Sequence, residues 1–146
     1  MRLYAESSAV LAWLLGEPNG ALVRTTLENA EFAMSSDVTL VECDRVLIRA
    51  TALGELSEAT AAARRSALNA AAADWHIAHL GREIVERARR AFPIEPVRTL
   101  DALHLATAIV TRQAIADLEM LSLDFRIRDA ASALGLSVQP RELAAR

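Results

Sequence analysis

The feature that most constrains this chain is the alternation of short apolar runs with longer segments of helical periodicity. Short apolar runs bounded by turn residues are typical of buried strands, and apolar residues three and four apart are typical of amphipathic helices. We expect strands at residues 3–5, 32–34, 75–78, 119–121 and 136–139. We expect helices at residues 9–15, 20–29, 39–53, 57–73, 82–92, 100–112 and 127–134. This alternation predicts an α/β fold with a mostly parallel central sheet flanked by helices.

The length and composition indicate one folded unit spanning residues 1–146. With 53% apolar and 24% charged residues, the chain is too hydrophobic for a disordered segment and long enough to bury a sizeable core. No linker rich in Pro, Gly or Ser divides it. No run of 18 apolar residues is present, and Glu6 falls where a secretory signal would be apolar. We therefore expect no membrane span and a cytoplasmic protein.

The residue types that the chain lacks exclude several chemistries. Without any Lys, it cannot form a Walker-type phosphate loop or a Schiff base. A single cysteine, Cys43, excludes an internal disulfide and a multi-thiolate zinc site. Three histidines are few for an imidazole metal site, so a bound metal would be held by carboxylates, which favours Mg²⁺ or Mn²⁺. The net charge of −3 argues against a broad basic surface for nucleic acid but leaves room for a small metal-bridged RNA site.

Four acidic residues occupy positions where parallel sheets commonly place ligands. Glu6 and Asp124 follow predicted strands, whereas Glu42 and Asp101 lie near the starts of predicted helices. If these carboxylates meet at one end of the sheet, their mutual repulsion requires a counter-charge, which a divalent cation would supply. Such an ion can activate water and stabilise the charge that develops on a phosphodiester.

Each of these acids also has a structural explanation that the sequence leaves open. Glu6 could be an exposed surface acid. Thr39 and Glu42 have the spacing of a capping box, and Glu42 could instead pair with an arginine along its helix. Asp101 suits a first helical turn and Asp124 suits an N-cap, so no single acid identifies a metal site.

The three histidines are further candidates for the site. His104 lies one helical turn after Asp101 and could contact a carboxylate or substrate, although a packed histidine is the commoner role. His76 and His79 have the spacing of a ligand pair, but on a strand at residues 75–78 they would point to opposite faces. We therefore do not expect these two to bind a metal together.

The segments that carry the four acids resemble the PIN-domain family, and within it the VapC-type toxins of bacterial toxin–antitoxin pairs. The similar segments are residues 4–9, 36–45, 100–108, 122–126 and 130–136. The sequence LDALHLATA around Asp101 is the most specific of them, and residues 54–96 carry no motif of the family. The resemblance implies one doubly wound PIN domain over residues 1–146 and a Mg²⁺- or Mn²⁺-dependent endoribonuclease, in which metal-activated water attacks an RNA phosphodiester.

The resemblance also implies roles for individual residues. It assigns Glu6, Glu42, Asp101 and Asp124 as the catalytic acids, with Glu6, Asp101 and Asp124 as the metal ligands. Ser7 and Ser122 match small polar positions that would orient carboxylates or metal-bound waters. Members of the family usually have Asp at the position of Glu6, and Mg²⁺ demands near-ideal geometry. We therefore expect retained activity, with Mn²⁺ tolerated better than Mg²⁺.

The implied partners are an RNA substrate, a cognate antitoxin protein and a second copy of the chain in a homodimer. An acidic site would give the antitoxin a place to insert an arginine. Two other interpretations remain open. The chain could be a PIN-like binding module with a degraded site, or another metal-dependent phosphohydrolase of α/β type.

Overall fold

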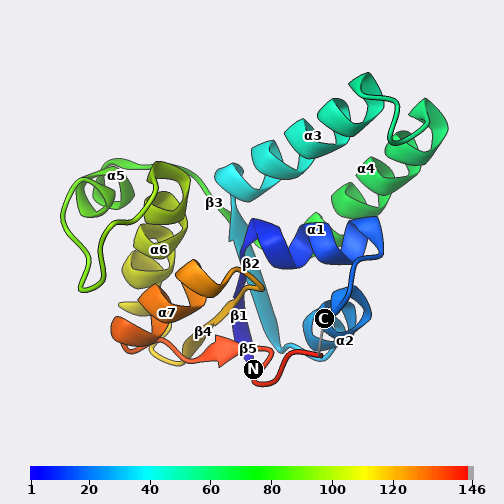
Figure 1. Cartoon of the computed structure of the whole chain (residues 1–146). Helices are drawn as coiled ribbons and strands as arrows, with labels where there is room; N and C mark the ends of the chain where they lie inside the picture. The colour runs from blue at the N-terminus through cyan, green and yellow to red at the C-terminus, as the bar shows by residue number, and fades with distance from the viewer. Residues whose placement is uncertain (145–146) are drawn as a thin grey trace.

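A five-stranded, all-parallel sheet with helices on both faces forms the protein in the computed structural model, which describes residues 1–144 (Figure 1). The strands are β1 (Arg2–Ala5), β2 (Phe32–Ser36), β3 (His76–Ala78), β4 (Leu118–Leu121) and β5 (Val138–Gln139). The helices are α1 (Ser7–Leu15), α2 (Gly20–Glu28), α3 (Asp37–Ala52), α4 (Glu58–Ala72), α5 (Arg82–Ala88), α6 (Thr99–Arg112) and α7 (Phe125–Ala133). The predicted fold class is confirmed, and every strand pair of the sheet is parallel rather than most of them.

The strand order β3-β2-β1-β4-β5 places β1 at the centre of the sheet. The chain moves outward from β1 to β2 and β3 on one side, then returns to β4 and β5 on the other. Between β1 and β4 the direction of winding therefore reverses, and in open α/β sheets ligands bind at such a point, beyond the carboxyl ends of the strands. The pairing of Ala5 with Leu121 brings the residues that follow these two strands together.

Side chains that alternate along β1 divide the core into two layers, because successive residues of a strand point to opposite faces of the sheet. Leu3 and Ala5 pack in a cluster with residues of α1, α2, α3 and α4. Tyr4 points the other way and packs with residues of α6 and α7. Figure 1 shows the same division, with α1 to α4 on one side of the sheet and α5 to α7 on the other.

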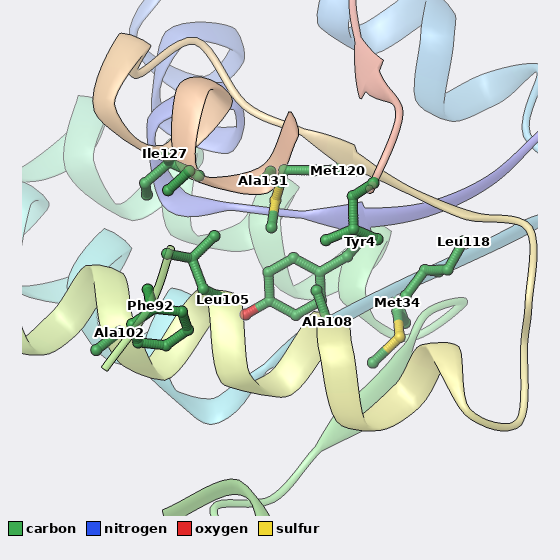
Figure 2. Packing of buried hydrophobic residues seen from close by; sticks show 12 residues of the cluster. Tyr4, Met34, Phe92, Ala102, Leu105, Ala108, Leu118, Met120, Ile127 and Ala131 are labelled. Atoms are coloured by element: carbon green, nitrogen blue, oxygen red, sulfur yellow. The ribbon is translucent and has the colours of Figure 1, made fainter. Parts of the chain in front are cut away.

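Tyr4 lies at the centre of the second layer, where its side chain is fully buried. Figure 2 shows its ring packed against Leu105 and Ala108 of α6, with Met34 and Met120 from the neighbouring strands close by. A phenol in such a place needs hydrogen-bond partners for its hydroxyl, because an unpaired buried polar group is costly. Those partners belong to the site described below.

The expected helix at residues 82–92 is too long, since α5 ends at Ala88. Phe92 leaves the helical path and is buried in the core, and the Arg87 guanidinium lies 4.4 Å from the centroid of its ring. Pro93 follows directly, and a residue before proline is disfavoured in the helical conformation. The helix therefore ends early, because the burial of Phe92 and the presence of Pro93 outweigh the helical spacing of apolar residues up to residue 92.

The other boundaries differ from expectation by a few residues. β2 continues to Ser36, because Ser35 and Ser36 pair with β3 and the Ser35 hydroxyl donates a hydrogen bond to the Ala5 carbonyl. α3 consequently begins at Asp37 rather than at residue 39. β5 is limited to two residues, because only Val138 and Gln139 pair with β4, while Leu136 directly follows the turn at Gly135, where φ is +82°. Within residues 1–144, no helix is long and apolar enough to span a membrane.

Candidate active site

The four predicted acids lie on four elements that meet near the carboxyl ends of the central strands. Glu6 follows β1 directly and caps α1, while Asp124 follows β4 and caps α7. Asp101 lies in the first turn of α6, and Glu42 lies in the second turn of α3. The N-cap that the sequence allowed for Asp124 is present, because its Oδ1 accepts hydrogen bonds from the backbone N–H groups of Arg126 and Ile127.

Asp101 and Asp124 share one cation, the guanidinium of Arg98. Its Nε donates to Asp101 Oδ2 at 2.9 Å, and its Nη2 donates to Asp124 Oδ2 at 3.4 Å. The Arg98 side chain is 60% exposed, whereas those of Asp101 and Asp124 are 13% and 28% exposed. A positive charge at the mouth of the site thus holds together two carboxylates that would otherwise repel each other.

Glu6 is buried, and its carboxylate is held by two serines. Oε1 accepts from the Ser8 backbone N–H at 3.0 Å, while Oε2 accepts from the Ser8 hydroxyl and from the Ser122 hydroxyl at 2.7 Å. Burial raises the pKa of Glu6 above its usual value, although nearby His104 and the hydrogen bonds oppose that shift. The interpretation of Glu6 as an exposed surface acid is therefore wrong, because Glu6 is only 4% exposed.

Glu42 takes part in a second hydrogen-bonded group, with Ser7 and His104. Its Oε1 accepts from the Ser7 hydroxyl at 2.7 Å and lies 2.6 Å from His104 Nε2. Partial burial acts to raise the pKa of Glu42, but the hydrogen bonds from His104 and Ser7 outweigh it and leave the pKa below its usual value. The capping box is not formed, because α3 begins at Asp37 and the Thr39 hydroxyl donates to the Ala5 carbonyl instead.

Contacts between neighbouring residues join these groups into one cluster. The Ser8 hydroxyl, which donates to Glu6, also accepts a hydrogen bond from the Asp124 backbone N–H at 3.1 Å. His104 Nε2, which contacts Glu42, lies 4.0 Å from Glu6 Oε1. The positive charge of Arg98 contributes to lowering the pKa of Glu42. The acids therefore form two pairs, Asp101 and Asp124 joined through Arg98, and Glu6 and Glu42 on either side of one nitrogen of His104.

The donors of this cluster suit a hard divalent cation, although they do not form a complete cage. Within residues 1–144, no three His, Cys, Asp or Glu side chains are arranged so that they could hold one metal ion. Mg²⁺, however, is commonly bound through one or two carboxylates and keeps several waters. Asp101 and Asp124, two carboxylates that already share one cation, fit that mode of binding.

Comparison with known families gives the decisive observation. The sequence profile described as the PIN domain matches residues 3–133. This chain belongs to the PIN domain family. Ribonuclease VapC46 of Mycobacterium tuberculosis is 31% identical over 136 residues, which is 93% of this PIN domain chain and 95% of that protein.

Solved structures share the fold of this PIN domain at low sequence identity. A toxin–antitoxin complex from Klebsiella pneumoniae has a chain with a TM-score of 0.64 at 17% identity, covering 99% of this chain and 100% of that one. Mycobacterium tuberculosis VapC20, titled a sarcin-ricin loop cleaving toxin, gives a TM-score of 0.63 at 17% identity and covers 92% and 95%. PAE2754 from Pyrobaculum aerophilum gives 0.59 at 14% identity, covering 94% and 83%.

Two residues of this PIN domain site, Ser8 and Arg98, escaped sequence reasoning. Each is polar and sits close in sequence to a predicted acid, Ser8 two residues after Glu6 and Arg98 three residues before Asp101. The spacing between Arg98 and Asp101 is that of an ion pair on one helix face and could have been noticed. Nothing in the sequence indicates that Ser8 reaches the backbone at Asp124, because that contact depends on how β1 and β4 pair.

The remaining candidates of this PIN domain have roles outside the site. His79 Nδ1 lies 3.0 Å from Asp37 Oδ2, while the His76 ring lies 6.4 Å from that of Phe32, so the two histidines do not act as a ligand pair. Burial and the nearby acids raise the pKa of the Cys43 thiol to about 12. Cys43 is therefore a core residue and a poor nucleophile, because the thiolate is the reactive form.

Proposed function

We propose that this PIN domain is a metal-dependent endoribonuclease and the toxin of a toxin–antitoxin pair. The observation that carries the proposal is the pair of carboxylates, Asp101 and Asp124, that share one cation beyond the carboxyl ends of the strands. Two hard anions from separate elements, gathered beside a buried third acid, form a binding place for a divalent ion. The family to which the chain belongs and its relative named Ribonuclease VapC46 support hydrolysis of RNA as the reaction.

Asp101 and Asp124 are the residues that would hold Mg²⁺ or Mn²⁺, and Glu6 would complete the set of ligands only after its carboxylate moves from its present position. When bound there, the ion supplies activated water and offsets the negative charge that develops on the phosphodiester. Glu6 contributes a carboxylate whose orientation Ser8 and Ser122 fix before any ligand arrives. Glu42, whose pKa the hydrogen bonds from His104 and Ser7 lower, would position a water or a second ion.

The length of Glu6 bears on the choice of ion. Its carboxylate is drawn toward Ser8 and Ser122, which limits how far it can adjust to a small ion with strict octahedral geometry. Mn²⁺ is therefore expected to support cleavage better than Mg²⁺ in this protein.

Partners follow from the same proposal. One structural neighbour is titled a toxin–antitoxin complex, which supports an antitoxin protein as the partner of this chain. An acidic site in which the Asp124 side chain is partly exposed and already contacts one guanidinium suits an inserted arginine of such a protein, because arginine can bind carboxylates bidentately. A homodimer remains a prediction.

A binding module without nuclease activity is the second candidate. It is favoured by the absence, within the described part of the chain, of three ligands around one point, and by Glu6 in place of the family's usual Asp. Such a module would bind RNA or protein with no requirement for a divalent ion.

Cleavage of total RNA by the purified protein, with sequencing of the new ends, tests the proposal. We expect cuts with Mn²⁺ and fewer with Mg²⁺, none with chelator, and a loss of at least about 100-fold in Asp101→Asn, because a ligand is removed. Asp117→Asn is the matched control, since Asp117 precedes β4 at the other end of the sheet and is exposed. Cleavage that survives chelation or Asp101→Asn would refute the metal-dependent nuclease.

A further inference from the structure

His104 is a buried histidine that connects the acidic cluster to the core. It lies on α6 one turn after Asp101, and the residue is 1% exposed. On one side its Nε2 contacts Glu42 Oε1 at 2.6 Å, and on the other its Nδ1 contacts the Tyr4 hydroxyl at 2.8 Å. The Tyr4 hydroxyl also lies 2.8 Å from the Ser36 hydroxyl. A continuous chain of hydrogen bonds therefore runs from β2 through β1 and α6 to the site.

The groups on either side of His104, Glu42 and Tyr4, determine that the proton of its neutral ring is on Nε2. Glu42 is ionised, so its oxygens only accept hydrogen bonds, and the His104 nitrogen that faces it must donate. Tyr4 is a phenol whose pKa burial raises far above its usual value, so its hydroxyl keeps its proton. With the proton on Nε2, the Nδ1 of His104 can only accept, so the Tyr4 hydroxyl donates to it and itself accepts from the Ser36 hydroxyl.

We propose that His104 is a positioning residue that holds the Glu42 carboxylate toward the other acids of the site, with Tyr4 fixing the orientation of its ring. This inference rests on the proposed nuclease function, because positioning has meaning only if Glu42 takes part in the reaction. His104 itself does not reach substrate, since its side chain is covered. It acts through Glu42, as residues behind a metal site orient the groups in front of them.

His104 does more than fill space in the core, because it restrains the Glu42 carboxylate. The Glu42 side chain is 28% exposed and comes from α3, which otherwise contributes no acid to the cluster. Both the His104 and the Ser7 hydrogen bonds reach Oε1, so the carboxylate is held at one oxygen. Loss of the His104 donor leaves only the Ser7 bond to restrain a long side chain near solvent.

Two amide variants of His104 separate positioning from packing. In His104→Gln the amide nitrogen can take the place of Nε2 and still donate to Glu42. In His104→Asn the same amide is one bond shorter and reaches only the place of Nδ1, beside Tyr4. We expect His104→Asn to lower kcat for RNA cleavage about 10- to 100-fold with KM within about twofold, and His104→Gln to recover most of kcat.

Tyr4→Phe provides a third variant that keeps the buried ring and removes only the hydroxyl. We expect a smaller loss of kcat, because His104 remains but its ring is less constrained. Melting temperatures of all three variants are measured alongside. Equal kcat in His104→Asn and His104→Gln, kcat values that simply follow the melting temperatures, or a rise in KM at constant kcat would each overturn the inference.

Asp101→Asn in the same assay keeps the two proposals apart. If Asp101→Asn still cleaves RNA, the proposed function fails, and the positioning role fails with it. If Asp101→Asn is inactive while His104→Asn matches the wild-type protein, only the inference about His104 fails.

Discussion

Glu6 is a buried acid whose carboxylate accepts hydrogen bonds from serine groups rather than from a cation. Its pKa is raised above the ordinary value of 4.5, so the folded state keeps a proton that the unfolded chain has already released. Below the ordinary pKa both states are protonated and the group contributes nothing to stability. As the pH rises from there through the raised pKa, the free energy of unfolding falls, and it stays lower at neutral pH.

Glu6→Gln is therefore expected to stabilise the metal-free protein at pH 7. For a chain of this size, the melting temperature should rise by about 3 °C for each kcal/mol by which the free energy of unfolding increases. The difference should vanish below the ordinary pKa of the acid, where Glu6 is protonated in both states. Thermal melts in chelator across this pH range make the comparison. A lower melting temperature for Glu6→Gln at every pH would mean that the serine hydrogen bonds outweigh burial.

The acids were predictable residue by residue, whereas their partners were not. Glu6, Asp101 and Asp124 each stand at a boundary between elements that the local pattern indicates. Ser122, which follows β4, was expected to orient a carboxylate, and it donates to Glu6, which follows the neighbouring strand β1. Ser8 could not be assigned, because only the pairing of β1 with β4 brings it to Asp124.

At the scale of elements, α1, the helix that carries Ser7 and Ser8 of the site, packs closely against α2. α1 begins with Ser7 and Ser8, and its far end packs against the start of α2 at Gly20. A Cβ on Gly20 would lie 2.3 Å from the Ala12 carbonyl oxygen and 3.1 Å from the Trp13 Cα, both atoms of the backbone. Only glycine permits this contact without a shift of one helix.

Gly20→Ala is expected to lower stability by about 1–3 kcal/mol, the usual cost of overpacking. The melting temperature should fall by about 3–10 °C. Gly81→Ala is the matched control, because a Cβ there meets nothing within 4 Å, and its effect should stay within about 1 kcal/mol. Equal melting temperatures for Gly20→Ala and the wild-type protein would show that the two helices adjust freely.

The type of each helix or strand was predictable from periodicity. The residue at which an element ends was not predictable where tertiary contacts determine it. The helix at residues 99–112 was found to within one residue, because its apolar face and its acidic first turn are local signals. The end of α5 depends on the burial of Phe92 in a distant cluster, which no local pattern reveals. The extra length of β2 depends likewise on its pairing with β3.

At the scale of the whole molecule, topology explains how acids that are scattered in sequence meet. Glu6 and Asp101 are separated by 95 positions, yet both lie at the carboxyl edge of one sheet because the winding reverses between β1 and β4. The class of fold followed from the alternation of strands and helices. The strand order and the pairing of the acids through Arg98 and His104 required the structure.

Calorimetric titration of the purified protein with Mn²⁺ tests the central claim most directly, because it needs no knowledge of the RNA that is cut. The account predicts saturable binding by the wild-type protein and by Asp117→Asn, and a loss of at least about tenfold in affinity for Asp101→Asn and Asp124→Asn. Absence of saturable Mn²⁺ binding, or binding that both site variants retain unchanged, would contradict it.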